Sequence, residues 1–476
     1  MSQKNETKIL VIASLITLAL IAVGVGWFTK FKSPSTENTS TSNQSPTTPS
    51  ESEISLTQSE QERFSAGERL LITSDTTPDK EAGIKAIAQK NYDEAVAQLE
   101  SSLEAQPNDP EALIYLNNAR IGEQKSYTIA ASMPIGKELG AAQEMLRGVA
   151  QAQTEINQAG GIGGVPLKVL IINDDNEPEV AQQVAQTLVK NSAILGVIGH
   201  LSSRVTLAAA EVYQQEGLVM ITPTSTSVAL SGAGEYIFRT VPSDRFAGDT
   251  LADYLLKKLK QQNAAVFFNS ESDYSKSLKD VFTTALLGAG GRVVDESDFA
   301  DSNFNAADAV KQAMDSEAEV LMLAPDSGSG ALDKALLVVQ VNDGRLPMLA
   351  GDSAYKLKTL QIGGKEAEGM ILAVPWHILG DPKADFPQAA KGLWGGDVNW
   401  RTALAYDATQ ALIAGLNQEP TRKGIQKTLA APGFSVPGAG EEIRFLPSGD
   451  RNQKVQLVTI KPGNSSGSGY DFVPIK

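Results

Sequence analysis

The chain has 476 residues, more than one hydrophobic core usually holds, so we expect two or more folded units joined by connecting segments. Lys and Arg number 41 against 56 Asp and Glu, and no basic run after residue 32 could follow a phosphate backbone, which argues against nucleic acid as a partner. The absence of cysteine excludes disulfides and thiolate chemistry. Only His200 and His377 are available for histidine catalysis or metal binding, so we expect neither a metal nor a cofactor.

The first segment of the chain is strongly apolar. Residues 9–28 read ILVIASLITLALIAVGVGWF and contain no charged side chain. At about 1.5 Å per residue, a helix of this length spans the hydrocarbon core of about 30 Å. We therefore predict a transmembrane helix over 9–28 within a membrane anchor over 1–32. A cleaved secretory signal is the alternative, but the apolar stretch is longer than a typical signal core and no small-x-small cleavage site follows it.

Residues 33–75 are predicted to be a disordered linker. From Ser33 to about Glu60 the chain is rich in Ser, Thr and Pro and nearly devoid of large apolar side chains. Such a segment cannot bury enough surface to offset the entropy of ordering it. We expect it to act as a flexible tether for the domains that follow.

Residues 76–121 show apolar side chains at helical spacing, interrupted at Lys90-Asn91 and again at 107–110, which predicts three short helices. The segment resembles one tetratricopeptide repeat followed by the first helix of a second. Because a single repeat does not normally close its own core, helices packed on the following domain are favoured over an independent peptide-binding groove. A protein partner for this segment is the alternative that stays open.

From Tyr127 the pattern changes to strict alternation of short apolar strands and amphipathic helices, in two successive series. Such alternation predicts an α/β fold with two lobes, each a mainly parallel sheet flanked by helices. We expect this bilobed domain to cover 126–476. Lobe 1 is expected at about 126–242 and 376–428, and lobe 2 at about 243–375 and 429–476. Near the end, Ser448-Gly449-Asp450 predicts a hairpin between IRFLP and VQLVTI.

Ligands of open α/β sheets sit beyond the carboxyl ends of the strands, so the strand-to-helix turns are the informative places. The turn after ILGVIG contains Ser203, and the turn after LVMIT contains Thr224, Ser225 and Thr226. Hydroxyls and free backbone N–H groups can bind a carboxylate without a buried arginine. The alternative is that Ser203 only caps a helix and that the second turn is solvated.

The second series offers complementary chemistry after its own strands. Tyr274 follows AAVFF at a helix start, Asp326 follows EVLMLA and Asp352 follows PMLA. Carboxylates at these positions could bind an ammonium group, and the aromatic ring could cover the ligand. Each of the three residues also has an ordinary structural interpretation as a turn, capping or core residue.

No catalytic pattern is present. The glycine run at 160–164 follows a helix and precedes a strand, which is the wrong order for a dinucleotide loop. Neither a P-loop motif nor H-E-x-x-H occurs. Paired carboxylates such as Asp174-Asp175 fall in loops, where solvation is the commoner explanation. We expect the protein not to be an enzyme.

From about Ser126 onward the chain resembles the type I periplasmic binding proteins of the branched-chain amino acid family, the solute receptors of ABC importers. The resemblance rests on GVAQAQTEINQAGGIGGVP, IGHLSS, MITPTSTS, IFRTVPSD and RFLPSGD. It implies two lobes that close by a hinge on a ligand in the cleft between them. By motif, Ser203, Ser225 and Thr226 match the carboxylate-binding turns with Thr224 beside them, while Tyr274 and Asp352 match the aromatic and acidic positions of the second lobe.

The chain departs from the family at two places. Leu139 stands in the first strand-to-helix turn, where relatives often present an aromatic ring, and Asp326 lies in a region that is aromatic in branched-chain binders. Polar or neutral amino acids and amides such as urea therefore stay open as ligands.

The function implied by the resemblance is an extracytoplasmic substrate-binding protein, held to the membrane by one N-terminal helix, that delivers an amino acid or similar small zwitterion to the membrane permease subunits of an ABC importer. A ligand sensor that signals to a protein partner, and a scaffold that has lost its ligand, are the alternatives.

Overall fold

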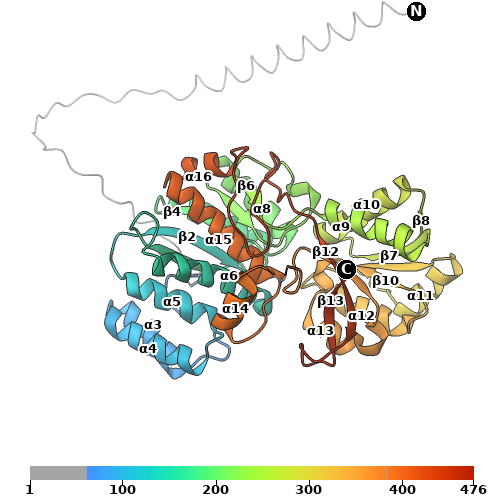
Figure 1. The fold of residues 1–476 in the computed structure, drawn as a ribbon, viewed down its shortest axis with the longest axis horizontal. Helices are drawn as coiled ribbons and strands as arrows, with labels where there is room; N and C mark the ends of the chain where they lie inside the picture. The colour runs from blue at the N-terminus through green and yellow to red at the C-terminus, as the bar shows by residue number, and fades with distance from the viewer. Residues whose placement is uncertain (1–61, 382, 476) are drawn as a thin grey trace, which may run out of the picture. The chain divides into compact units, whose positions relative to one another are not determined.

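The computed structural model describes residues 62–381 and 383–475. They form two lobes, each built on one sheet with helices on both faces, and a segment of three helices that precedes the first lobe (Figure 1). The predicted alternation of strands and helices is confirmed. The transmembrane helix predicted over 9–28 lies outside the described residues, and none of the helices within them is both long and apolar enough to span a bilayer.

The sheet of lobe 1 has six strands in the order β1-β3-β2-β4-β5-β6. All neighbours are parallel except β1, which pairs antiparallel with β3. The carboxyl ends of the parallel strands therefore meet at one edge. The strands are β1 (Phe64–Ser65), β2 (Tyr127–Met133), β3 (Leu167–Asn173), β4 (Ile194–Ile198), β5 (Met220–Thr222) and β6 (Ile237–Arg239).

Helices cover this sheet on both faces, which explains why consecutive residues of β2 and β5 are buried. Along β2, Ile129 and Ala131 pack in one cluster with α6 and α15, and Ala130 between them packs in another with α7 and α8. The helices of lobe 1 are α6 (Leu139–Gln158), α7 (Pro178–Lys190), α8 (Ser203–Gln215), α14 (Phe386–Trp394), α15 (Trp400–Gln418) and α16 (Arg422–Leu429), with a short turn η1 (Val228–Leu230).

Lobe 2 repeats this plan with a seven-stranded sheet in the order β13-β12-β11-β10-β9-β7-β8. The strands from β7 to β11 are parallel, and β12 and β13 add an antiparallel edge. The strands are β7 (Asn263–Phe268), β8 (Arg292–Asp298), β9 (Val320–Ala324), β10 (Met348–Ala350), β11 (Ile371–Val374), β12 (Gln456–Pro462) and β13 (Tyr470–Pro474).

The helices of lobe 2 also lie on two sides of their sheet. Side chains of α9 and α10 share one core cluster with it, and those of α11 and α12 share another. These elements are α9 (Asp244–Asp253), η2 (Tyr254–Leu259), α10 (Asp273–Gly288), α11 (Ala306–Asp315), α12 (Ala331–Asn342), η3 (Asp352–Ala354), α13 (Leu357–Gly363) and η4 (Gly364–Ala367).

The C-terminal part of the chain divides differently from the prediction, which gave all of 429–476 to lobe 2. Residues up to Arg451 pack on lobe 1: Ile443 belongs to its core, and Asp450 pairs at 2.6 Å with the buried Arg239 of β6. Only β12 and β13 belong to the second sheet. The predicted hairpin forms only in part. The turn at Ser448-Gly449-Asp450 brings Phe445 of IRFLP into an antiparallel bridge with Arg451, but VQLVTI is not the second arm of this hairpin: it lies in β12, which pairs with β11 and β13.

The three predicted helices of the N-terminal segment are α3 (Pro78–Ala88), α4 (Tyr92–Ala105) and α5 (Pro110–Ile121). Thr77 and Asp109 cap α3 and α5 directly before a proline at the first helical position. Almost all of α5 is buried, since it lies between α4 and α6 (Figure 1). The segment is thus part of the core of lobe 1.

Of the linker predicted over 33–75, residues 33–61 lie outside the described residues, and residues 62–75 are folded onto lobe 1, contrary to the prediction. Phe64 and Ser65 form β1 at the edge of the first sheet, and Ile72 is buried. Glu111 of α5 holds this stretch by accepting the backbone N–H groups of Leu71 and Ile72 at 2.8 and 3.2 Å. Composition did not predict that this stretch is ordered, because Leu71 and Ile72 are held by a residue about forty positions away in the chain.

Candidate functional site

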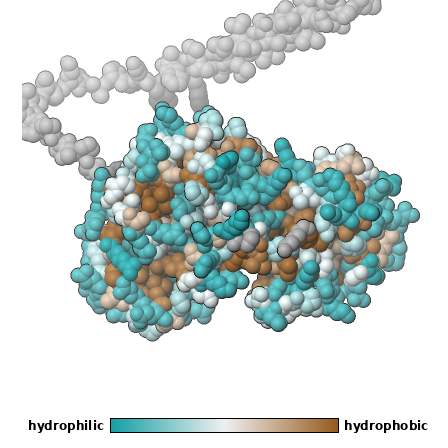
Figure 2. All heavy atoms as spheres, viewed as in Figure 1, coloured by the Kyte–Doolittle hydropathy of each residue, from teal (hydrophilic) through white to brown (hydrophobic). Residues whose placement is uncertain are grey.

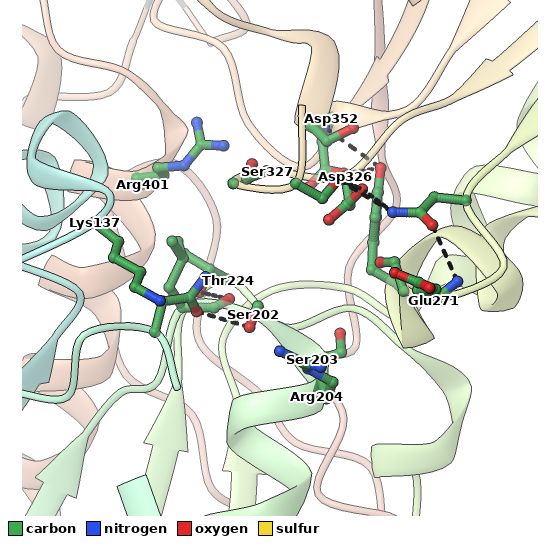
Figure 3. Close-up of a pocket in the computed structure, with 18 of the residues that line it drawn as sticks. Lys137, Ser202, Ser203, Arg204, Thr224, Glu271, Asp326, Ser327, Asp352 and Arg401 are labelled. Carbon is green, nitrogen blue, oxygen red and sulfur yellow. Dashed lines mark hydrogen bonds between the residues drawn. The ribbon is translucent and has the colours of Figure 1, made fainter. Parts of the chain in front are cut away.

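A cavity of about 210 Å³ lies between the two lobes. It is lined by the turns that follow β2, β3, β4 and β5 of lobe 1, by the turns that follow β7, β9 and β10 of lobe 2, and by the start of α15. The rule that ligands sit beyond the carboxyl ends of parallel strands therefore holds for both sheets. Figure 3 shows Asp326 and Asp352 of lobe 2 facing Lys137, Ser202 and Thr224 of lobe 1.

The first turn of α8 presents free donors to this cavity. Ser202 is the N-cap residue, but its hydroxyl bonds to Asn176 at 2.7 Å and makes no capping bond. Ser203 is the first residue of the helix, is 2% exposed and lines the cavity. Ser203 is therefore not the N-cap residue, and its hydroxyl accepts the backbone N–H of Ser227 at 3.3 Å; its role in ligand binding stays a prediction. Because no side chain caps this turn, its N–H groups and partial positive charge remain for an anion.

The second hydroxyl-rich turn is divided between cavity and core. Thr224 lines the cavity and is held by hydrogen bonds from its hydroxyl to the carbonyls of His200 and Leu201, at 3.1 and 2.7 Å. Ser225 and Thr226 do not line the cavity, contrary to the prediction. The Ser225 hydroxyl bonds to Leu201 and Thr206, and Thr226 is buried beside the start of α9.

A buried polar cluster fixes the strand ends beneath these turns. Asp174 accepts hydrogen bonds from Ser132 at 3.0 Å and from His200 Nδ1 at 2.6 Å, and all three side chains are fully buried. Although the residue types are those of a hydrolase triad, the serine bonds to the carboxylate and not to the histidine, and the cavity does not reach them. The cluster joins the ends of β2, β3 and β4.

On lobe 2, Asp352 and Tyr274 form the acidic and aromatic pair that the sequence predicted. Both line the cavity, and the Tyr274 hydroxyl donates to Asp352 Oδ1 at 2.7 Å. Asp352 is 8% exposed. Burial raises the pKa of its carboxyl, while the hydrogen bond from Tyr274 and the charge of Arg401 act in the opposite direction. A ligand ammonium group would favour the charged form.

Asp326 lines the same cavity from the turn after β9. Its Oδ1 accepts hydrogen bonds from Asn269 at 2.8 Å and from Ser329 at 2.6 Å, so it orders the neighbouring turns of lobe 2. Five of the seven predicted site residues are thus brought together: Ser203, Thr224, Tyr274, Asp326 and Asp352.

Sequence reasoning missed three cations at the cavity, Lys137, Arg204 and Arg401. Lys137 forms an ion pair with Glu177, and Arg204 is exposed. Arg401 is buried at the start of α15, with its guanidinium 4.2 Å from the ring centroid of Trp400. Arg401 could have been singled out from the sequence, because it is the sole charged residue in the stretch NWRTALAY. A lone charge in an otherwise apolar helix is an unusual feature that calls for a partner or a function.

The described residues contain no group of three or more His, Asp or Glu side chains arranged to hold a metal ion. The site contains hydroxyls, backbone N–H groups, amides, carboxylates and three cationic side chains, of which only the Arg401 guanidinium is buried. These are the elements for binding a small charged solute.

Comparison with known proteins identifies the family. A family model described as periplasmic binding protein matches residues 138–467, more than half of the chain. The chain belongs to the periplasmic binding protein family. The Leu/Ile/Val-binding protein of Escherichia coli (strain K12) is 29% identical over 292 residues, which are 60% of this chain and 77% of that protein. An amino acid binding protein of Pseudomonas aeruginosa is 30% identical over 288 residues, 58% of this chain and 74% of that one.

Solved structures of other periplasmic binding proteins share the fold. A leucine-binding protein of Thermotoga maritima aligns with a TM-score of 0.64 and 22% identity, covering 73% of this chain and 98% of its own. A solute-binding protein of R. palustris in complex with 4-hydroxybenzoate gives 0.65 and 14%, covering 74% and 96%. The bilobed α/β prediction and the family resemblance are therefore confirmed.

Proposed function

We propose that this periplasmic binding protein is the substrate-binding component of an ABC importer, that it binds an amino acid or similar small zwitterion between its lobes, and that it delivers this solute to a membrane permease. Residues 9–28 would hold it to the membrane, with the described residues on the extracytoplasmic side. The observation that carries the proposal is the pairing of uncapped donors at the start of α8 with a carboxylate across the same cavity.

Each half of the cavity suits one end of a zwitterion. The first turn of α8, at Ser203, offers N–H groups for an α-carboxylate, and such charge-assisted bonds are about twice as strong as neutral ones. Asp352 offers a carboxylate for the ammonium group, with Tyr274 fixing its orientation. A ligand that bonds to both lobes at once favours their closed arrangement, which is how a binding protein reports occupancy to a permease.

The relatives support the same class of solute. Two of them carry names that describe Leu/Ile/Val binding and amino acid binding. The structural neighbour with 4-hydroxybenzoate shows that this fold also accepts a carboxylate without an ammonium group. The carboxyl of Asp352 separates these two ligand classes, because it would repel a ligand that has only a carboxylate.

Calorimetric titration of the full chain with each of the twenty amino acids tests the proposal. We expect saturable binding of at least one, and an affinity loss of about tenfold or more in Asp352→Asn, since a charged hydrogen bond is worth about 1.5–3 kcal/mol. Asp343→Asn is the matched control, because Asp343 is exposed at the end of α12 in a left-handed conformation that Asn adopts readily. Binding that Asp352→Asn leaves unchanged would count against the proposed ammonium site.

Recovery of permease subunits with the full chain from detergent-solubilised membranes tests the delivery step. A signalling protein recovered in their place would favour the sensor alternative.

A further inference from the structure

Arg401 is an exception among the buried cations of the described residues. Four Lys and Arg side chains are buried there, and three have carboxylate partners: Lys80 pairs with Asp109 and Glu111, Arg239 with Asp450, and Arg451 with Asp407. The guanidinium of Arg401 makes no ion pair with any described residue, and its Nε has no hydrogen-bond partner. It is 4% exposed, and burial is the main cause that lowers its pKa.

An unpaired buried guanidinium is costly, because it loses hydration without receiving a partner charge. The ring of Trp400 recovers part of this cost as a cation–π contact at 4.2 Å. The cavity, which Arg401 lines, is where the remaining donors can find an acceptor. A buried charged side chain that lines a cavity and lacks an ion-pair partner is typical of a residue that binds a ligand.

The charges of Asp352, Glu144 and Glu138 favour the charged form of Arg401, but none of these carboxylates forms an ion pair with it, and each has another partner. Asp352 accepts the Tyr274 hydroxyl, Glu144 pairs with Arg147 at 2.8 Å, and Glu138 pairs with Lys356 at 3.3 Å. Arg401 therefore does not serve to neutralise one of them by direct contact. Figure 3 shows Arg401, Ser203 and Asp352 at three separate positions around the cavity.

We infer that Arg401 binds a second anionic group of the ligand, so that the solute is an amino acid with an acidic side chain, such as a dicarboxylic amino acid. The inference rests on the proposed function. The α-carboxylate would lie at the first turn of α8, the ammonium group at Asp352, and the side-chain carboxylate on the planar fork of Arg401, which can donate two parallel hydrogen bonds. Leucine, isoleucine and valine would leave this charge unpaired.

The test compares acids with their near-isosteric amides by titration calorimetry on the full chain: glutamate with glutamine, and aspartate with asparagine. We expect one acid to bind at least about tenfold tighter than its amide, because a site built around a charged group rejects a ligand that leaves it unpaired. Arg401→Gln should remove this preference by weakening the acid about tenfold or more while the amide changes little. Arg401→Lys, which keeps the charge but loses the fork, should retain part of the preference.

Lys391→Gln is the matched control, since Lys391 forms an exposed ion pair with Asp397 and does not line the cavity. It should leave the affinity for both acid and amide unchanged. A second measurement is the thermal unfolding of the ligand-free protein. We expect the midpoint of Arg401→Gln to stay level or rise, because the substitution removes an unpaired buried charge; a fall of several degrees would mean that Arg401 is structural.

Amino acid binding and the role of Arg401 are tested by separate outcomes. If no amino acid binds the wild-type chain, the proposed function fails. If amides bind as tightly as acids, or if Arg401→Gln weakens acids and amides equally, the protein still binds amino acids and the assignment of Arg401 to a second anion is overturned. Equal weakening would place the α-carboxylate on Arg401.

Discussion

The hydroxyl of Tyr274 donates to Oδ1 of Asp352 at 2.7 Å, which joins the start of α10 to η3. The bond fixes the direction of the carboxylate and leaves its second oxygen for a ligand. It also opposes the rise in the pKa of Asp352 that burial causes. The arrangement makes the acidic side of the cavity dependent on a residue 78 positions away.

Tyr274→Phe should weaken binding of the preferred amino acid by about tenfold, because a hydrogen bond to a charged group is worth about 1.5 kcal/mol or more. The loss should be larger at lower pH, since the pKa of Asp352 would rise further without the phenol and more of the carboxyl would be protonated. Titration calorimetry at pH 6 and pH 8 measures both effects. An equal loss at the two pH values would contradict the second expectation.

Gly351→Ala should produce a similar defect for a steric reason. A Cβ at Gly351 would lie 2.3 Å from Tyr274 Oη and 2.4 Å from Leu278 Cδ2, so the tyrosine would have to move away from Asp352. We expect an affinity loss comparable to that of Tyr274→Phe. Gly288→Ala, at a position with open space around it, serves as the control. Wild-type affinity in Gly351→Ala would show that the turn can yield without disturbing the pair.

Asp244, at the start of α9, should make the protein less stable at higher pH. Burial raises the pKa of this carboxyl from its ordinary value of 3.8 to about 7. Between these pH values the folded protein keeps a proton that the unfolded chain has lost, so the free energy of unfolding falls as pH rises from about 4 to about 7, by up to about 1.4 kcal/mol per pH unit. Above that window the carboxylate is charged in both states and the loss is complete.

Urea denaturation of Asp244→Asn at pH 5 and pH 8 checks this effect. The variant should be more stable than the wild type at pH 8, and the advantage should shrink at pH 5, where the native carboxyl is also neutral. Asp249→Asn, on the exposed side of the same helix, should behave as the wild type at both pH values. An advantage of Asp244→Asn that is the same at both pH values would have another cause.

Glu111→Ala should destabilise lobe 1. Glu111 is fully buried, pairs with Lys80 at 2.7 Å and accepts the Tyr115 hydroxyl at 3.0 Å besides the N–H of Leu71. Breaking such a buried pair costs about 3–5 kcal/mol. Glu123→Ala removes the partner of Lys90 in an exposed ion pair and should leave the unfolding midpoint unchanged. A small effect of Glu111→Ala would mean that the N-terminal helices are not integral to the lobe.

The sequence predicted those features that follow from local pattern. Alternating apolar runs located the strands, and the turn rule pointed to Ser203, Tyr274 and Asp352, because strand ends can be found without knowledge of the partners of a strand. The sequence did not predict which side chains line the cavity where this depends on contacts between distant segments. Ser225 and Thr226 have the same hydroxyl chemistry as Thr224, and only the bonds to Leu201, Thr206 and α9 decide which of them turn inward.

Arg401 and β1 are two further features that local sequence pattern did not predict, because both depend on contacts with distant segments. Arg401 follows no strand, and α15 reaches the cavity only because it packs beside α6 on lobe 1. The strand at Phe64–Ser65 is too short to carry a pattern of its own, and it forms because β3 leaves an edge beside it.

Figure 2 shows hydrophilic side chains over much of the visible surface of the described residues, with hydrophobic ones between them. Among residues 62–381 and 383–475, the exposed large hydrophobic side chains lie between β7 and α14, a stretch that forms most of lobe 2. They are Leu287, Leu337, Leu357, Ile362 and Leu379.

A crystal structure of the full chain with its tightest amino acid ligand tests the central claim most directly. The account predicts density for one ligand in the cavity between the lobes, with its α-carboxylate on the first turn of α8 at Ser203 and its ammonium group on Asp352. A ligand bound outside this cavity, or bound in it without contact to either residue, would contradict the account.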